Sequence, residues 1–129
     1  MAREVSNVVG MGADLLDIDR FRAVLIRRPG LVKRCFTESE RFSLEERRDR
    51  VPGLAVRFAA KEAVMKALGV GLGGFALRDV EVQRDSSGEP LLLLHGRAAR
   101  LAETRGVSEW RISLSHTSSN AMAVALALG

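Results

Sequence analysis

The sequence predicts an α+β fold in which an antiparallel sheet packs around one long central helix. Residues 51–68 predict the helix, because they are rich in good helix formers and their apolar positions cover most of its circumference. Residues 80–95 and 110–128 predict the sheet, because apolar and polar residues alternate at 80–84 and 110–115 and each stretch is followed by a turn sequence and a second, apolar strand. A chain of 129 residues can form its own core, so we expect one domain over residues 1–129.

The chain is expected to begin with a loose lead-in at residues 1–6 and then a short strand. This strand covers residues 8–14 and ends in a glycine-rich turn at Gly10 and Gly12, which leaves Asp14 at its end. The glycines are not a dinucleotide-binding fingerprint, because the third glycine of that motif is missing.

An amphipathic helix is expected over residues 17–28, and Pro29–Gly30 should end it. The simplest role for Asp14 or Asp17 is to cap this helix. Several basic side chains point away from its apolar face, and most such faces are simply solvated. They are Arg20, Arg22, Arg27 and Arg28.

A capping box predicts the start of the next helix, with Thr37 as the cap, Glu40 three residues later and Phe36 as a possible staple. We expect this polar helix to continue to about Arg48.

The long helix then begins, with Asp49 expected as its cap, Pro52 in its first turn and Gly69 after its end. Glu62 lies on an apolar face of this helix, where a carboxylate must be paired, bind a metal or hold its proton to a higher pH. The simplest alternative is a structural ion pair with Lys66, four residues later.

The second half is expected to contain mainly strands. The turn at residues 69–75 has four glycines, and it either brings backbone amides to a phosphate or is a plain linker. The remaining expected elements are a hairpin of strands 80–84 and 91–95, a helix over 96–105, and a final hairpin of strands 110–115 and 121–128.

The composition limits the possible functions. A net charge of +4 and a pI near 10.2 favour an acidic partner or substrate. The chain has no Tyr, one Trp and no long basic tract, which argues against a nucleic-acid-binding module. Cys35 is the only cysteine, which excludes an internal disulfide and fits a reducing compartment. We expect no secretory signal and no membrane span.

Five motifs, taken in order, resemble one family over nearly the whole chain. They are Gly10-x-Gly12-x-Asp14, Phe36-Thr37-Glu38-x-Glu40, Arg57–Ala63 continuing to Lys66–Gly69, Asp85-x-x-Gly88-x-Pro90, and Ser113–Thr117. Together they resemble the holo-[acyl-carrier-protein] synthases, the small phosphopantetheinyl transferases. The departures are a few extra N-terminal residues and the glycine-heavy turn at 69–74.

The resemblance implies a Mg²⁺-dependent transfer of the phosphopantetheine arm of coenzyme A to a serine of apo acyl carrier protein, with release of adenosine 3′,5′-bisphosphate. Asp14 and Glu62 would hold Mg²⁺. Lys66 would stabilise the leaving group, and either Glu62 or a water that it orients would be the base. The catalytic residues would thus be Asp14, Glu62 and Lys66.

The resemblance also implies further contacts. Coenzyme A would meet Arg57, Lys61, Lys66, Gly69, His116 and Thr117. His116 has an alternative role, since a histidine at a strand end often only bonds backbone. The acidic carrier protein would dock on Arg20, Arg22 and Arg27.

The family's small members also imply a phosphopantetheinyl transferase fold, a homotrimer with sites between chains, and a cytoplasmic role in fatty acid or polyketide biosynthesis. Two alternatives from other classes stay open at this point. One is a thioesterase-like enzyme, which would need no metal. The other is a basic nucleic-acid-binding module, which would bind DNA or RNA with a steep salt dependence.

Overall fold

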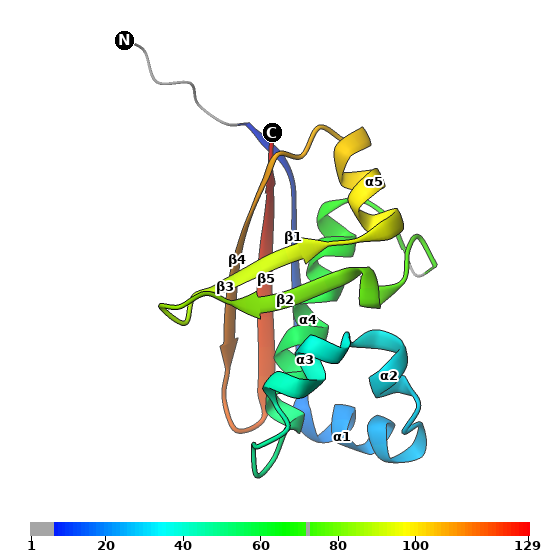
Figure 1. Ribbon diagram of the computed structural model, residues 1–129, viewed down its shortest axis with the longest axis vertical. Helices are drawn as coiled ribbons and strands as arrows, with labels where there is room; N and C mark the ends of the chain where they lie inside the picture. The colour runs from blue at the N-terminus through cyan, green and yellow to red at the C-terminus, as the bar shows by residue number, and fades with distance from the viewer. Residues whose placement is uncertain (1–6, 72) are drawn as a thin grey trace.

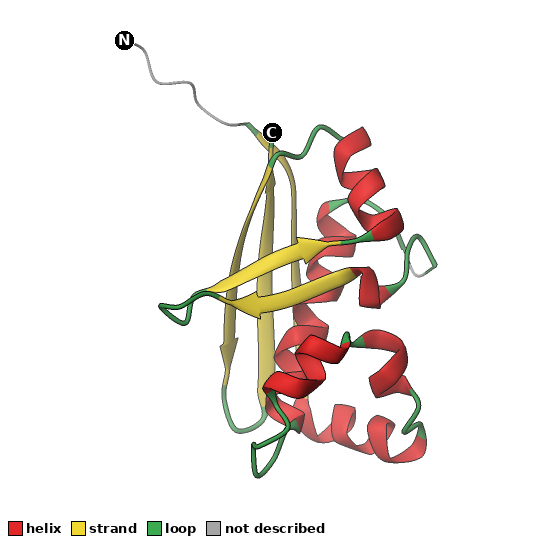
Figure 2. Ribbon diagram, viewed as in Figure 1, coloured by secondary structure: helices red, strands yellow, loops and turns green. Residues whose placement is uncertain are grey.

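The computed structural model describes residues 7–71 and 73–129 and confirms the α+β class (Figures 1 and 2). The expected lead-in at 1–6 and Leu72 of the glycine-rich turn lie outside the described residues. In chain order the elements are β1 (Val8–Asp17), α1 (Ile18–Arg27), α2 (Leu31–Cys35), α3 (Glu38–Ser43), α4 (Val51–Ala67), η1 (Leu77–Asp79), β2 (Val80–Arg84), β3 (Pro90–Leu94), α5 (Gly96–Thr104), β4 (Glu109–His116) and β5 (Asn120–Leu128).

Strands β1, β5 and β4 form one antiparallel sheet in that order, and β2 and β3 form a separate hairpin that crosses in front of it (Figure 1). The β5 residues that face α4 are all small and fully buried: Ala121, Ala123, Ala125 and Ala127. On the opposite face Met11, Leu15 and Met122 are 65%, 68% and 45% exposed. The helices therefore cover one face of this sheet and leave an apolar face outside.

Two glycines allow β1 to lie directly on α4. A Cβ atom on Gly10 would come within 2.0 Å of the Ala67 carbonyl oxygen, and one on Gly12 within 2.0 Å of the Ala63 carbonyl oxygen. The expectation of a turn at these glycines is wrong, because the strand continues through them and pairs with β5 as far as Asp17. Glycine is needed at both positions because the strand packs too closely on the helix for any side chain.

The helical boundaries also differ from expectation. Asp17 caps α1 through a 2.9 Å bond from the Arg20 amide, so Asp14 is not the cap. The capping box of Thr37 and Glu40 is confirmed, but α3 ends at Ser43, well before Arg48.

The long helix predicted over 51–68 is present as α4. Its N-cap residue is Arg50, and the neighbouring Asp49 accepts a 3.1 Å bond from the Val51 amide. The short α2 and η1 were not predicted from the sequence. No helix within residues 7–71 and 73–129 has the length and hydropathy needed to cross a bilayer.

A Gly12→Ala substitution should destabilise the fold by about 2–3 kcal/mol, because its methyl group would overlap backbone that cannot move without separating β1 from α4. Urea unfolding measures the change. Gly30→Ala is the matched control, since nothing lies within 4 Å of its Cβ position and its φ of −66° suits alanine. A Gly12→Ala protein as stable as this control would contradict the packing account.

Candidate functional site

The first candidate site lies where the end of β1 meets α4. Asp14 lies on the strand face that is turned toward the helix, with its side chain 18% exposed. The Lys66 ammonium binds the Asp14 carboxylate at 3.0 Å and the Ala13 carbonyl oxygen at 2.9 Å. The ion pair of Lys66 is therefore with Asp14, and the alternative of a Glu62–Lys66 pair is wrong for this structure.

Glu62 completes this cluster, one helical turn before Lys66. Burial raises the pKa of the Glu62 carboxyl group, the nearby Asp14 raises it further, and Lys66 opposes both effects. The effect of Asp14 on Glu62 shows that the two carboxyl groups share one small region. We call Asp14, Glu62 and Lys66 the carboxylate cluster.

The carboxylate cluster fits a Mg²⁺ ion of the kind that binds phosphates. Such an ion needs only one or two protein carboxylates, because water and substrate oxygens fill its other positions. Within the described residues no group of three or more His, Cys, Asp or Glu side chains is arranged to hold a metal. A site that depends on substrate oxygens agrees with this donor set.

A second candidate site is a basic cavity of about 300 Å³ between α3, α4 and β2. We call it the arginine pocket. Its lining residues are Ser39, Ser43, Arg47, Arg57, Val82, Gln83 and Arg84. Three guanidinium groups facing one cavity favour the binding of an anion, with phosphate as the usual partner.

Arg57 is the buried arginine of the arginine pocket, with only 5% exposure. Its Nη1 donates to the Gly53 carbonyl oxygen at 3.2 Å, while its Nε has no partner among the described residues. Burial lowers the pKa of the Arg57 guanidinium, Glu40 opposes this, and Arg84 and Arg47 add to the lowering. A phosphate in the pocket would offset both the burial and the repulsion.

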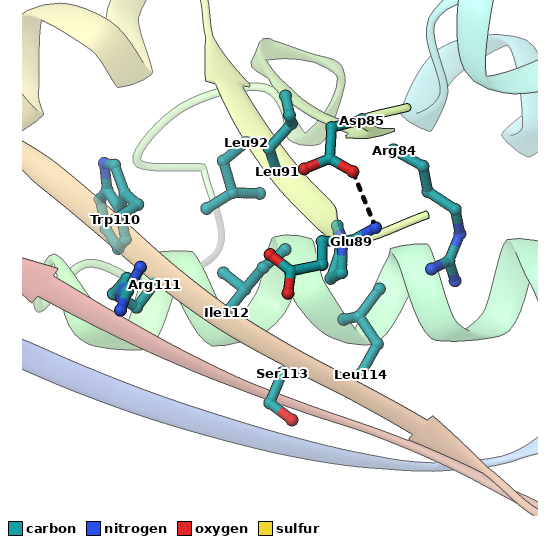
Figure 3. A pocket seen from close by; sticks show the side chains of 11 residues that line it. Arg84, Asp85, Glu89, Leu91, Leu92, Trp110, Arg111, Ile112, Ser113 and Leu114 are labelled. Carbon is teal, nitrogen blue, oxygen red and sulfur yellow. Dashed lines mark hydrogen bonds between the residues drawn. The ribbon is translucent and has the colours of Figure 1, made fainter. Parts of the chain in front are cut away.

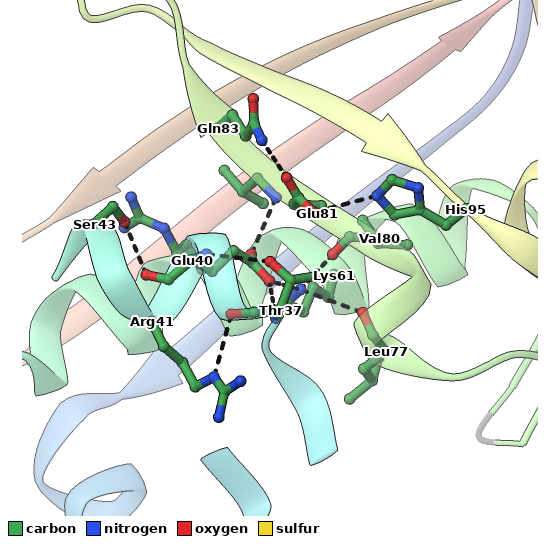
Figure 4. A network of polar contacts seen from close by, with 12 residues as sticks. Thr37, Glu40, Arg41, Ser43, Lys61, Leu77, Val80, Glu81, Gln83 and His95 are labelled. Carbon is green, nitrogen blue, oxygen red and sulfur yellow. Dashed lines mark hydrogen bonds and ion pairs between the residues drawn. The ribbon is translucent and has the colours of Figure 1, made fainter. Parts of the chain in front are cut away.

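Lys61 does not take the place expected for a coenzyme contact. Its side chain is fully buried, and its ammonium donates to Glu40, the Leu77 carbonyl oxygen and the Val80 carbonyl oxygen (Figure 4). An ammonium has three N–H groups, so these acceptors use all of them. The structure therefore places Lys61, which was expected to contact coenzyme A, in the core with its N–H groups already bonded.

The other expected coenzyme contacts lie at chain turns. His116 and Thr117 are exposed at the β4–β5 connection, and Thr117 Oγ1 accepts bonds from the Ser119 and Asn120 amides at 3.2 and 3.0 Å. His116 Nδ1 lies 3.4 Å from the Thr117 carbonyl oxygen, a long contact that leaves the ring available. Gly69 follows α4 with a φ of +70°.

The two candidate sites lie on different sides of α4. Arg57 and Glu62 are five residues apart, so their side chains point about 140° apart around the helix axis. The structure thus brings Asp14, Glu62 and Lys66 together but places Arg57 elsewhere within the same chain. A substrate that contacts both sites of one chain must pass around the helix. The alternative is that it contacts one site on each of two chains.

Figure 3 shows a wider cleft of about 530 Å³ between the β2–β3 hairpin and β4. Trp110 and Leu92 face it from the two sides, and the Glu89 amide donates to Asp85 at 3.0 Å across the hairpin turn. Of the residues expected to bind coenzyme A or metal, none lines the described part of this cleft.

The expected docking helix is α1. Arg20 and Arg27 are exposed, whereas both terminal nitrogens of Arg22 bind Asp49, at 3.0 and 2.8 Å. Two of the three expected docking residues therefore present exposed side chains, and Arg22 would first have to leave Asp49.

Sequence reasoning missed the pocket role of Arg47, Arg84, Ser39 and Ser43. These residues are far apart in the chain and become neighbours only when α3, α4 and β2 pack together. Glu40 was identified only as a helix cap, although the apolar surroundings of Phe36 and Leu44 indicate a buried position.

Comparison with known proteins gives one consistent result. Residues 10–126 match the family described as the 4′-phosphopantetheinyl transferase superfamily. The chain is 46% identical over 123 residues to a protein of Streptomyces avermitilis named holo-[acyl-carrier-protein] synthase, covering 95% of this chain and 99% of the relative.

Solved structures agree. The acyl carrier protein synthase of Plasmodium yoelii with ADP bound superposes with a TM-score of 0.90, at 27% identity and 98% coverage of both chains. A holo-(acyl-carrier-protein) synthase of Bacillus anthracis in complex with CoA (3′,5′-ADP) superposes with a TM-score of 0.79, at 28% identity, covering 96% of this chain and 98% of the other.

The pKa of Glu62, measured by NMR titration of labelled carboxyl carbons, should lie above the ordinary value of a glutamate. Asp14→Asn should lower it, because the substitution removes a negative charge that favours the protonated form. Lys66→Met should raise it further, because a neighbouring positive charge is lost. If the Glu62 titration is unchanged in both variants, the three side chains do not form one cluster.

Proposed function

The chain belongs to the holo-[acyl-carrier-protein] synthases of the 4′-phosphopantetheinyl transferase superfamily, and we propose that it moves phosphopantetheine from coenzyme A to a serine of apo acyl carrier protein with the help of Mg²⁺. This membership replaces the thioesterase-like and nucleic-acid-binding alternatives. The observation that carries the proposal is the carboxylate cluster, in which two carboxyl groups and an ammonium meet at one exposed edge of α4.

In the proposed reaction the serine oxygen forms a bond to the phosphorus that bears the pantetheine. The bond from this phosphorus to the bridging oxygen of the pyrophosphate breaks, and that oxygen leaves with adenosine 3′,5′-bisphosphate. The serine proton passes to Glu62, directly or through a water that it orients. Lys66 is placed to neutralise charge that develops on the leaving phosphate.

Asp14 and Glu62 would hold the Mg²⁺ ion. When bound, Mg²⁺ neutralises the pyrophosphate oxygens and so lowers the barrier to attack by the serine. Lys66 now binds Asp14 at 3.0 Å and would turn to the phosphate when the ion takes its place.

We assign a phosphate of the nucleotide half of coenzyme A to the arginine pocket. The unpartnered Nε of Arg57 supports this, since a buried donor with no acceptor is costly until an anion binds. His116 and Thr117 are proposed as further contacts to the nucleotide half, and Gly69 as a backbone contact.

We further propose a homotrimer whose active sites lie between chains. The outer face of the β1–β5–β4 sheet exposes Met11, Leu15 and Met122, an apolar surface that association would cover. The separation of Arg57 from Glu62 around α4 supports a site completed by a second chain, since one coenzyme A must reach both.

The reaction would supply carrier proteins for fatty acid or polyketide biosynthesis in the cytoplasm. Cys35, the chain's only cysteine, is a free buried thiol, which agrees with a reducing compartment. Depletion of the protein should leave carrier proteins of these pathways in the apo form; unchanged holo forms would contradict this role.

Mass spectrometry of apo acyl carrier protein incubated with this protein, coenzyme A and Mg²⁺ tests the reaction. The carrier protein should gain the mass of phosphopantetheine. Asp14→Ala or Glu62→Ala should lower the rate by about a thousandfold or more while the fold is retained. Absence of transfer to several carrier proteins, or near-normal turnover of either variant at limiting Mg²⁺, would contradict the proposal.

Charge reversal on α1 tests carrier-protein docking. Arg20→Glu should raise the KM for carrier protein by about tenfold, because an attractive contact becomes repulsive, and leave the KM for coenzyme A unchanged. Arg100→Glu on α5 changes the net charge equally at an exposed position and is the control. Equal damage to both KM values would place Arg20 outside a docking surface.

Mixed trimers test the shared site. Arg57→Met and Glu62→Gln should each be inactive alone, and unfolding and reassembly of an equal mixture should restore about a quarter of the sites, because each site then needs one variant of each kind in the correct order. Sedimentation checks the assembly. An active monomer would contradict the trimer, and trimers that never regain activity would place each site within one chain.

A further inference from the structure

A buried ion pair joins the three elements that form the arginine pocket (Figure 4). Glu40 of α3 and Lys61 of α4 have fully buried side chains, and Lys61 Nζ lies 2.8 Å from Glu40 Oε1. The other oxygen, Glu40 Oε2, accepts a 3.0 Å bond from the Val82 amide of β2. One carboxylate therefore connects α3, α4 and β2.

The pocket residues lie directly beside these connections. Ser39 and Ser43 flank Glu40 on α3, and the Ser43 hydroxyl donates to the Glu40 carbonyl oxygen at 2.8 Å. Arg57 is one helical turn before Lys61 on α4. Arg84 comes two residues after Val82 on β2. A shift of any of the three elements relative to Glu40 would move a wall of the pocket.

The stability of the core alone does not account for this pair. Removing two charges from water is costly, and apolar residues of similar volume often stabilise a core as well or better. The cost is reduced here because Glu40 Oε1 also accepts a 2.9 Å bond from the Thr37 amide. The Lys61 ammonium is likewise satisfied by three acceptors.

The charge of Glu40 also acts on the pocket itself. Within the described residues it is the acid that opposes the effect of burial on Arg57, whereas Arg47 and Arg84 act in the other direction. The Glu40 carboxylate therefore favours the charged form of Arg57 before any anion binds.

We propose that Glu40 is a positioning residue for the nucleotide half of coenzyme A: paired with Lys61, it holds the three walls of the arginine pocket in the arrangement that phosphate binding requires. This inference rests on the proposed function, because it assumes that the nucleotide half occupies this pocket. Glu40 touches no substrate in this account and acts through Arg57 and β2.

Calorimetric binding of adenosine 3′,5′-bisphosphate, together with transfer kinetics, tests the role. In Glu40→Gln the Kd for this nucleotide and the KM for coenzyme A should both rise about tenfold, as expected for the loss of a charge-assisted contact. The kcat and the KM for carrier protein should change less than about twofold. Glu38→Gln, at an exposed position of the same helix, should behave as the wild type.

A second variant covers the case in which Glu40→Gln unfolds because Lys61 is left unpaired. Glu40→Met combined with Lys61→Met removes both charges at similar volume, so it should fold, and it should lose the same nucleotide affinity. A folded variant of either kind that binds the nucleotide like the wild type would overturn the inference, as would an equal loss in kcat and both KM values.

The outcomes also separate this inference from the proposed function. If the wild type binds the nucleotide but transfers no phosphopantetheine, the proposed function fails and the nucleotide affinities of the variants still decide the role of Glu40. If the wild type binds no adenosine 3′,5′-bisphosphate, the pocket assignment and the role of Glu40 both fail.

Discussion

Direct contact between the backbone of β1 and α4 is the constraint on which the rest of the molecule depends. Gly10 and Gly12 leave no room for a side chain against the Ala67 and Ala63 carbonyl oxygens. The alanines of β5 extend the same close packing to the next strand. Because the strand is held this close, Asp14 reaches Lys66 at 3.0 Å and lies near enough to Glu62 to raise its pKa. Packing of small residues thus produces the charged site.

The charged side chains of α4 have different surroundings on different sides of the helix. Lys61 points into the core and is neutralised by Glu40, which joins the helix to α3 and β2. Glu62 and Lys66 face β1 and belong to the carboxylate cluster. Arg57 is buried toward a cavity that holds two more arginines. One helix therefore supplies both a site suited to a cation and a site suited to an anion, on separate sides, and a pyrophosphate ester such as coenzyme A has the chemistry to use both.

Local signals in the sequence predicted most of the fold. The helix formers of 51–68 correspond to α4, and the capping box at Thr37 corresponds to α3. The alternating and apolar stretches of the second half correspond to the strands there. The predicted path of β1 was wrong. Gly10 and Gly12 were assigned to a turn, whereas glycine is needed there because the backbone of α4 lies against the strand. The family resemblance implied that Lys61 contacts coenzyme A, whereas its ammonium binds Glu40 in the core, because a rotation of 100° per residue turns it away from Glu62. The arginine pocket was missed because it depends on contacts between distant segments.

The central claim is that Asp14 and Glu62, brought together by the packing of β1 on α4, hold the metal of a phosphopantetheinyl transferase. The most direct measurement is an anomalous difference map from crystals grown with coenzyme A and Mn²⁺ in place of Mg²⁺. The account predicts a single strong peak bound by both carboxylates and by oxygens of the coenzyme. A bound coenzyme with its manganese peak at other side chains, or with no peak between Asp14 and Glu62, would contradict it.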